Sequence, residues 1–409
     1  MKFGGTSVGS AQRIASVAEQ VSEVVRSGTK VVVVVSAMSG ETNRLIELGK
    51  SVAGKSLCGR EYDQLLTAGE HASVALTALA LKNIDIPACS LLAHQLGIQT
   101  ITRFGQNLIS SINTEFLQEL LDEGVVPVVA GFQGINEQGE YTTLSRGGSD
   151  TTAVALAAAL GSCRCEILTD IDGVYSALPS VCKSAKKLDS LSYEEMLEMA
   201  NSGAKVLQAR SVSLAHKYRV PLVVRSSFGG GEGTRIVEEY PGMEDAVVSG
   251  ITCRTDEAKL TIRNLPDQPG IAAKVFESLA TAGVVVDMIV QSQGISEHTA
   301  ISFTVPEESG ELAQNALNTL LKKEGLSSAS VELDNDIAKL SVVGEGMRTH
   351  AGVASRVFHV LGEERINVEM ITTSEIKISV AIKARYSELA VRALHEAFIE
   401  EDVLEKVIG

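Results

Sequence analysis

The chain has 409 residues, of which 44% are hydrophobic and 21% are charged, proportions typical of a globular protein. At roughly 100 to 200 residues per domain, this length predicts two or three domains. Because 36 basic and 51 acidic residues leave a net charge of −15, we expect neither a nucleic-acid-binding nor a membrane-binding surface.

The apolar stretches and the cysteines indicate the cellular compartment in which we expect the protein to work. No apolar run approaches the roughly 20 residues that cross a bilayer, and no signal-peptide segment follows Lys2. The six cysteines show no disulfide spacing, which indicates reduced thiols in a cytoplasmic protein. Cys163 and Cys165 form a close pair without a nearby histidine, so we expect free thiols there and no metal site.

A glycine-rich turn follows the first predicted strand. Lys2 stands at the end of that strand, and residues 2–10 read KFGGTSVGS. Gly4 and Gly5 carry no Cβ, so the backbone N–H groups of the turn can approach an anion closely. With the positive charge of the lysine in front, this pattern predicts a phosphate-binding turn.

Short apolar runs alternate with helical segments from Lys2 to about Phe228. The expected strands include residues 30–36, 125–130, 165–169 and 221–225, and the expected helices include residues 11–27, 61–81, 107–123, 151–160 and 192–199. This alternation predicts an α/β layer with a mostly parallel sheet. Ligands bind at the carboxyl ends of such strands, and the polar loops SAMSG, GFQG and TDIDG follow three of them.

A second candidate anion site precedes an alanine-rich helix. Residues 142–152 read TTLSRGGSDTT, which places Arg146 beside a Gly-Gly turn and Ser149 and Asp150 at the helix start. Serine or aspartate at this position is also an ordinary helix cap, so the segment alone leaves a structural role open. Arg146 favours carboxylate or phosphate binding. Together with Lys2, the segment predicts a two-sided clamp on a transferring phosphoryl group, without Walker or protein-kinase motifs.

Beyond a glycine-rich break at residues 229–234, the chain contains two copies of one pattern. GIAAKVF at 270–276 matches GVASRVF at 352–358, and VDMI matches VEMI at the same offset. Each copy predicts strand, helix, strand, strand, helix, the order of a small ferredoxin-like module. In the first copy these elements are residues 259–263, 271–282, 284–291, 299–305 and 311–323. We therefore divide the chain into residues 1–235, 243–335 and 336–409.

Four segments and the C-terminal repeat together resemble the aspartate kinase family. The segments read KFGGTSVGS (2–10), TLSRGGSDTTA (143–153), TDIDGVY (169–175) and GAKVL (203–207), and they occur in the family's order. The resemblance implies an α/β amino-acid-kinase fold, a mostly parallel sheet in an αβα sandwich, followed by two ferredoxin-like ACT modules. It also implies transfer of the ATP γ-phosphoryl group to the side-chain carboxylate of L-aspartate, the first step toward lysine, threonine and methionine. Mg²⁺ would accompany ATP, held mainly by phosphate oxygens and water.

The resemblance assigns roles to individual residues of the kinase part. Lys2 would neutralise the moving phosphoryl group, and Asp150 would orient that lysine. The aspartate-binding positions would be Ser36, Thr42, Glu70, Arg146 and Ser149, with Glu70 on the substrate ammonium and Arg146 on its α-carboxylate. The nucleotide-binding positions would be Gly4, Gly5, Ser7, Thr169, Asp170, Tyr175 and Lys205. A solvated helix charge and a half-buried strand residue are the structural alternatives for Glu70 and Tyr175.

The chain departs from the family after Tyr175. The family usually continues toward an Asp-Pro-Arg turn, whereas this chain has Leu178, Pro179 and Ser180. The lost arginine would help to hold ATP phosphates. We therefore expect a working kinase with weakened ATP binding.

The resemblance further implies that the paired ACT modules hold a small amino acid, with feedback inhibition by lysine, threonine or both. The candidate contacts are Asp267, Met288, Ile289 and Gln291 in the first module and Asn367, Met370, Ile371 and Ser374 in the second. Packing into the module core is the alternative for the two methionines, because apolar residues alternate there. Module pairing predicts a homo-oligomer or, if a separate regulatory subunit starts at Met243, an αβ assembly.

Two other functions stay open from the sequence. A kinase on the same fold could take glutamate, N-acetylglutamate or UMP as its acceptor, although TSVGS and the ACT repeat favour aspartate. A catalytically weak amino-acid sensor is the second alternative. The presence of Lys2, Arg146 and Asp150 argues against it.

Overall fold

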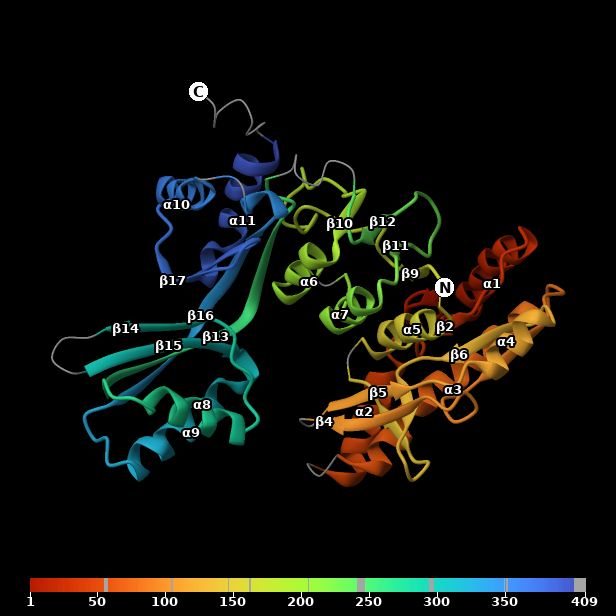
Figure 1. Ribbon diagram of the computed structural model, residues 1–409, viewed down its shortest axis with the longest axis horizontal. Helices are drawn as coiled ribbons and strands as arrows, with labels where there is room; N and C mark the ends of the chain where they lie inside the picture. The colour runs from red at the N-terminus through yellow and green to blue at the C-terminus, as the bar shows by residue number, and fades with distance from the viewer. Residues whose placement is uncertain are drawn as a thin grey trace. The chain divides into compact units, whose positions relative to one another are not determined.

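The protein divides into two compact units, which we describe separately (Figure 1). The computed structural model describes residues 1–54, 58–103, 106–145, 147–161, 163–204, 206–240, 247–293, 298–348, 350 and 352–400. The first unit comprises Met1–Val174, Lys187–Ala200 and Lys205–Pro241, and the second comprises Tyr175–Lys186, Asn201–Ala204 and Gly242–Gly409. The units do not follow chain order, since a segment of the predicted kinase domain belongs to the second unit.

A mostly parallel sheet forms the centre of the first unit. In spatial order its described strands are β10 (Ser190–Ser192), β12 (Thr234–Val237), β11 (Leu222–Ser226), β9 (Cys165–Thr169), β1 (Lys2–Phe3), β2 (Val33–Val35), β6 (Val126–Ala130) and β3 (Ala88–Leu91). Strands β3, β6, β2, β1, β9 and β11 run parallel, while β12 is antiparallel to β11. Their valines and leucines are almost fully buried, which explains why the alternation in the sequence identified this sheet.

Helices pack on this sheet through apolar stripes. They are α1 (Ala11–Arg26), α2 (Glu41–Ala53), α3 (Arg60–Lys82), α4 (Glu115–Asp122), α5 (Gly148–Ala159), α6 (Tyr193–Asn201) and α7 (Ala209–Tyr218). Val17 and Val21 of α1 and Val74 of α3 lie in one core with Phe3 and with two valines of β2, Val33 and Val35. Spacings of three to four residues place such side chains on one helix face. The predicted α/β architecture is confirmed.

The helix predicted over residues 107–123 is wrong in its first half. The chain instead forms β5 (Gln106–Ser111), which pairs with β4 (Gln99–Arg103), and α4 begins only at Glu115. The small sheet continues through β7 (Gln133–Ile135) and β8 (Tyr141–Thr143). Pairing with the adjacent strand β4 therefore overrides the helical pattern of residues 107–111.

The second unit is built on an antiparallel sheet with the strand order of two joined modules. Among the described residues this order is β14 (Ile289–Gln293), β15 (His298–Pro306), β13 (Gly250–Pro266), β16 (Ser330–Val343), β18 (Lys377–Lys383) and β17 (Val368–Thr373). The helices are α8 (Ile271–Thr281), α9 (Gly310–Lys323), α10 (Val353–Glu363) and α11 (Ser387–His395). Short turns are η1 (Glu307–Ser309), η2 (Glu345–Arg348), η3 (Ala384–Tyr386) and η4 (Glu396–Glu400). The strand predicted at residues 284–291 begins only at Ile289, although Asp287 N–H already donates to Thr304 O.

The two modules share their long strands instead of following one another. β13 and β16 run through both modules (Figure 1), and their antiparallel pairing extends from Gly250 with Val343 to Arg263 with Ser330. Ile251, placed by the sequence in the first module, packs in the core of the second with Leu340. In sequence, the first module thus lies between the first strand segment of the second module and the remaining elements of the second module. The predicted border at residues 335/336 falls inside β16.

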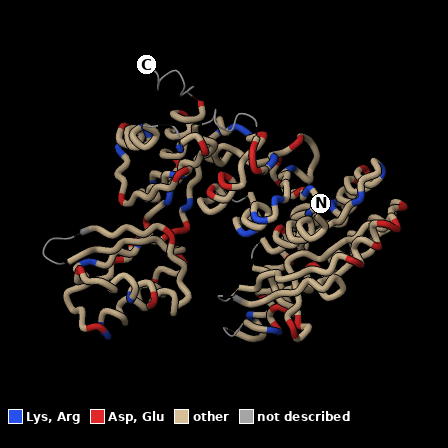
Figure 2. Tube along the Cα trace, viewed as in Figure 1, with Lys and Arg blue, Asp and Glu red and all other residues tan. Residues whose placement is uncertain are grey.

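Charges of both signs are interspersed along both units (Figure 2). No helix within the described ranges is long and apolar enough to cross a membrane. Residues 241–246, which include Met243, lie outside the described residues.

Candidate active site

Lys2 lies in the middle of the parallel sheet of the first unit. Its strand β1 is bordered by β2 on one side and β9 on the other, with Lys2 opposite Val34 and Ile167. The Lys2 Nζ atom is 2.6 Å from Asp150 Oδ1, and both side chains are 10% exposed. Asp150 Oδ1 has no well-aligned hydrogen bond among the described residues, so the contact is an ion pair. The lysine is therefore held by charge at a largely buried position.

The turn after Lys2 packs against the loop that follows β2. A Cβ on Gly5 would lie 2.8 Å from Ala37 O, which excludes any larger residue without a backbone shift. The Gly5 carbonyl accepts the Ser39 N–H at 3.1 Å. Gly4 N–H donates to Leu168 O at 3.1 Å, which also attaches the turn to β9. The predicted phosphate turn and the predicted aspartate loop thus form one tightly packed surface.

Ser7 uses its polar groups inside the protein. Its hydroxyl lies 2.7 Å from Ser227 Oγ, its N–H donates to Gly4 O at 2.9 Å, and the residue is fully buried. To contact a phosphate directly, this hydroxyl would have to leave Ser227. The structure thus gives Ser7 a role in fixing the turn.

The amino end of α5 brings Ser149 and Asp150 to the same edge of the sheet. Gly147 precedes the helix with φ +73°, and a Cβ there would overlap the Gln208 side chain at 1.8 Å. A Cβ on Gly131, just after β6, would lie 2.6 Å from Ser149 Oγ. Free N–H groups and the positive end of the helix dipole favour an anion here. Arg146, the predicted partner of the substrate carboxylate, lies outside the described residues.

Glu70 is a buried carboxylate that contacts the loop after β2. It is 3% exposed, and its Oε1 accepts the Ala37 N–H at 3.0 Å, while Oε2 has no hydrogen-bond partner among the described residues. Loss of hydration raises the pKa of Glu70 to about 7. A buried carboxylate with an unused oxygen suits a cationic ligand group, and its burial argues against the solvated alternative.

The other predicted aspartate positions surround this loop. Ser36 is half-buried, and its N–H donates to Phe3 O at 3.2 Å. Thr42 lies in the first turn of α2, after Gly40 with φ +82°. Both therefore lie at the carboxyl ends of β1 and β2, near the Gly5 turn.

The predicted nucleotide residues are divided by the structure. Thr169 ends β9, its hydroxyl donates to Asp170 Oδ1 at 3.0 Å, and its carbonyl accepts the Ser227 N–H at 2.8 Å. Tyr175 belongs to the second unit, and Lys205 lies outside the described residues. The described nucleotide-side residues of the first unit thus meet at the carboxyl end of β9.

The comparisons with known proteins agree with this geometry. A model of the amino acid kinase family matches residues 1–226, and a model of the ACT domain matches residues 263–321 and 340–398. The aspartate kinase of Pseudomonas fluorescens is 50% identical over 97% of this chain and 96% of its own length. An aspartokinase of Helicobacter pylori is 48% identical over 97% of this chain and 98% of its own. This chain belongs to the aspartate kinase family.

Solved aspartate kinases share its fold. The structure of E. coli aspartokinase III in complex with aspartate and ADP has a TM-score of 0.83 at 26% identity, covering 98% of this chain and 99% of that one. The complex of that enzyme with lysine and aspartate has a TM-score of 0.75 at 26% identity, over 97% and 98%. The family fold therefore extends through both ACT modules.

Two further side chains that contact the candidate site, Ser73 and Arg13, were not identified from the sequence. Ser73 donates to Ser36 O at 2.7 Å, one helical turn after Glu70 on α3. Arg13 donates to Ser227 O at 3.2 Å, and its guanidinium lies 3.6 Å from the centre of the Phe228 ring. The i, i+3 spacing from Glu70 is a signal that could have identified Ser73. No local signal connects Arg13 with Ser227.

The effector candidates separate into buried and exposed groups. Met288 and Met370 are 3% and 4% exposed and pack together with Ala381 in a small core. This is the packing alternative that the sequence left open. Ile289 and Ile371, at equivalent positions of the two modules, are 49% and 46% exposed.

The polar effector candidates lie on the surface of the second unit. Asp267, Asn367 and Ser374 are exposed. Gln291 is also exposed, and its amide donates to Thr299 Oγ1 at 3.4 Å. These side chains are accessible to a ligand in the chain as described.

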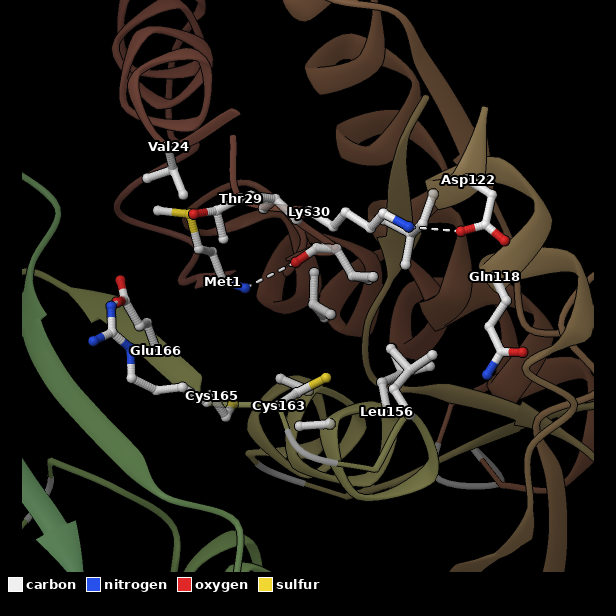
Figure 3. A pocket seen from close by; sticks show the side chains of 18 residues that line it. Met1, Val24, Thr29, Lys30, Gln118, Asp122, Leu156, Cys163, Cys165 and Glu166 are labelled. Atoms are coloured by element: carbon white, nitrogen blue, oxygen red, sulfur yellow. Dashed lines mark hydrogen bonds and ion pairs between the residues drawn. The ribbon is translucent and has the colours of Figure 1, made fainter. Parts of the chain in front are cut away.

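A cavity of about 810 Å³ lies at the opposite end of the parallel sheet (Figure 3). Met1, Lys30 and Cys165 line it at the amino ends of β1, β2 and β9, and Leu156 of α5 closes one side. The Met1 ammonium donates to Val32 O at 2.8 Å, and burial lowers the pKa of this amine. None of the described lining residues is a predicted site residue, so we do not assign this cavity to catalysis.

Proposed function

We propose that this chain transfers the γ-phosphoryl group of ATP to the side-chain carboxylate of L-aspartate, giving 4-phospho-L-aspartate. The observation that supports this most directly is the Lys2–Asp150 ion pair at the carboxyl edge of the sheet, beside the amino end of α5. Family membership supplies the acceptor.

The chemistry depends mainly on positioning and charge. The transferring phosphoryl group carries negative charge on its three equatorial oxygens in the transition state. The Lys2 ammonium would neutralise that charge, and Asp150 would keep the ammonium in place. The N–H groups at the start of α5 add a fixed positive potential.

Glu70 and the loop after β2 would hold the substrate. The unused Glu70 oxygen is suited to the aspartate ammonium. Ser36 follows β2, and Thr42 and Ser149 lie in the first turns of α2 and α5 at the same edge of the sheet. Arg146 would bind the α-carboxylate, by resemblance to the family. The side-chain carboxylate would then face Lys2.

ATP would bind at the carboxyl end of β9. Gly4, Gly5, Thr169 and Asp170 are the contacts we retain, with Ser7 fixing the turn. Tyr175 and Lys205 keep their nucleotide-side assignment as predictions from the family resemblance. Because Ser180 stands where the family has an arginine, we expect a raised KM for ATP.

Mg²⁺ would accompany ATP and neutralise part of the phosphate charge. The Asp150 carboxylate is already committed to Lys2, so most ligands of the ion would come from phosphate oxygens and water. Asp170, at the carboxyl end of β9, carries an exposed carboxylate, and its Oδ1 accepts the Thr169 hydroxyl.

Regulation would act through the ACT modules. We propose lysine, threonine or both as effectors, bound by Asp267, Ile289 and Gln291 in the first module and Asn367, Ile371 and Ser374 in the second. Met288 and Met370 would shape the site from the core. Calorimetric titration of the full chain with each amino acid tests this, and binding of neither would refute it.

Assembly and location complete the proposal. The exposed edge residues Ile289 and Ile371 favour pairing of modules between chains in a homo-oligomer or an αβ assembly. Light scattering on the purified protein tests the oligomer. A cytoplasmic location stays a prediction from the sequence.

Trapping of the acyl phosphate with hydroxylamine tests the reaction itself. With aspartate as acceptor we expect a hydroxamate. With glutamate, N-acetylglutamate or UMP as acceptor we expect little release of ADP. Product at saturating ATP with aspartate alone supports the proposal. Absence of trapped product with aspartate, or faster ADP release with another acceptor, would refute it.

A further inference from the structure

Three potential metal ligands converge inside the second unit. They are Cys182, His395 and Glu400, and one ligand atom of each lies within 4.8 Å of the other two. Cys182 and His395 are 3% and 0% exposed, whereas Glu400 reaches the surface. Cys182 comes from the Tyr175–Lys186 segment and the other two from the end of the second ACT module, so the group joins chain segments far apart in sequence.

The helix at this position has an unusual form that brings its two ligands together. α11 ends at His395, and the chain continues as the π-helical turn η4, Glu396–Glu400. In an α-helix, residues five apart point about 140° away from each other. A π turn places them one above the other, and His395 Nδ1 is 3.0 Å from Glu400 Oε1. Single π turns are rare and occur frequently at functional sites.

A second set of contacts orients the histidine. Its other ring nitrogen, Nε2, lies 2.9 Å from Ser176 Oγ, and Ser176 Oγ accepts the Lys186 N–H at 2.9 Å. Histidine ligands usually donate the proton of the free nitrogen to such a neighbour, which directs the other lone pair at the metal. Ser184 contacts both Cys182, at 3.2 Å, and Glu400. Hydrogen bonds from Ser176 and Ser184 therefore fix the orientation of the three candidate ligands.

We propose that Cys182, His395 Nδ1 and Glu400 bind one divalent transition-metal ion with the chemistry of Zn²⁺. One thiolate, one imidazole and one carboxylate form a ligand set suited to this ion. Tetrahedral zinc with these ligands needs ligand atoms about 3.5 Å apart, so the observed spacing requires only side-chain adjustment. Water or the Ser184 hydroxyl would complete the tetrahedron. The sequence did not reveal the site, because its ligands are separated by most of the regulatory region.

Binding would replace hydrogen bonds by metal bonds. The ion would take the place of the proton on Cys182, which leaves to solvent, and the His395 proton would reside on Nε2 facing Ser176. The ion would fasten the Tyr175–Lys186 segment, whose Ala177 and Cys182 already pack in the core of the second module, to the end of α11. The Tyr175–Lys186 segment continues directly from the loop after β9. The metal would therefore fix the part of this segment around Cys182.

Cobalt substitution of the full-length protein tests the proposal without reliance on activity. The tag-free, reduced protein is treated with a chelator and titrated with Co²⁺. We expect about one ion per chain, visible bands of tetrahedral cobalt, and a near-ultraviolet thiolate-to-cobalt band that Zn²⁺ abolishes. Absence of the thiolate band in the wild-type protein would overturn the proposal before any variant is made.

Matched variants locate the ion. Cys182→Ser should lose the thiolate-to-cobalt band, and His395→Gln should lose the tight stoichiometric binding of Co²⁺. The control Cys58→Ser, which removes an exposed thiol, should keep both the band and the binding. Ser176→Ala should weaken the affinity about tenfold through the histidine, with the band retained. Circular dichroism reports folding of each variant. A band that persists in Cys182→Ser, or disappears in Cys58→Ser, would refute the site.

Discussion

Each unit of the protein contains a buried lysine, and the two differ in their partners. Lys2 in the first unit is 8% exposed as a whole residue, and it pairs with Asp150 beside loops at the edge of the sheet. Lys339 in the second unit is 3% exposed and faces Asp287 and, at 3.9 Å, Glu257. Arg254 adds a second cation 3.2 Å from Glu257.

The comparison shows that burial alone does not identify a catalytic lysine. A lysine paired with one carboxylate beside a helix amino end still attracts an incoming phosphate. A lysine between two carboxylates on the face of a sheet has its charge compensated already. Lys339 lies in β16 and Asp287 just before β14, so this cluster joins the two ACT modules. Lys259 and Glu369 form the reciprocal pair, from β13 to β17.

Removal of Lys2 should have the largest effect. Lys2→Ala should lower kcat about 10²–10³-fold, because the charge that stabilises the transferring phosphoryl group is gone. Lys30→Ala is the matched control, since Lys30 is an exposed lysine of the same unit that pairs with Asp122. The hydroxamate assay measures both, with circular dichroism as the folding check. Retained product formation in Lys2→Ala would remove this lysine from the mechanism.

Removal of Lys339 should affect stability and leave the phosphoryl transfer step intact. Lys339→Met should lower the free energy of unfolding of the second unit by about 3 kcal/mol, because Glu257 would remain buried with Arg254 alone. Burial already raises the pKa of Glu257, and loss of Lys339 should raise it further, so the destabilisation should grow with pH. Urea unfolding of the full chain at two pH values measures this.

Two further variants separate the Lys339 ion pair from a general packing effect. Adding Glu257→Gln to Lys339→Met should restore part of the stability. Lys274→Met, at an exposed pair with Glu324, should leave the unfolding midpoint unchanged. Equal destabilisation by both lysine variants would contradict the distinction.

Glu70 should give aspartate binding a pH dependence. The pKa of Glu70 is raised from 4.5 to about 7 by burial, and the proposed contact with the aspartate ammonium needs the ionised form. The value of kcat/KM for aspartate should therefore rise with pH through about 7, since this profile reports free-enzyme ionisations. Glu70→Gln should abolish this rise and lower kcat/KM about 10–100-fold. An unchanged profile in the variant would assign the ionisation elsewhere.

The raised pKa of Glu70 also affects the stability of the protein. The folded state binds the Glu70 proton more tightly than the unfolded chain, whose carboxyl titrates near 4.5. The free energy of unfolding should thus fall as pH rises from 4.5 to about 7, and Glu70→Gln should remove this component of the fall. Denaturant unfolding across this range provides the measurement.

Ser73 should show the smallest effect. Ser73→Ala removes the hydrogen bond to Ser36 O and should raise KM for aspartate by roughly 5–10-fold, the equivalent of about 1 kcal/mol. Thr77→Ala is a matched control on the same helix, because Thr77 donates to Ser73 O inside α3. If both variants change KM equally, the loop does not depend on Ser73.

Patterns within short segments predicted much of the fold. Continuous valines predicted β2 and β6, since strands covered on both faces need apolar residues throughout. Residues 107–111 were misread as helix because pairing with the adjacent strand β4 outweighs their local helical pattern. The sharing of β13 and β16 between modules was equally hidden, since a repeat at constant offset is compatible with tandem modules.

The candidate site was predictable where family motifs cover it. The motifs named Lys2 and Asp150, and the structure pairs them at 2.6 Å. Ser7 was predicted among the nucleotide-binding positions, and its hydroxyl is directed to Ser227, because strand β11 ends beside the turn. Tyr175 follows the nucleotide strand in sequence but belongs to the second unit. Which unit a residue belongs to depends on long-range packing that a motif does not encode.

The strand sharing between modules has a consequence for synthesis on the ribosome. Ile251 emerges early, but its neighbours Leu340 and Val342 are made only after the whole first module has been translated. The first module can therefore close while its neighbour still lacks a partner strand, and the segment around Ile251 has no β16 partner in the meantime. A newly made chain would thus complete its inner module first and its outer module last.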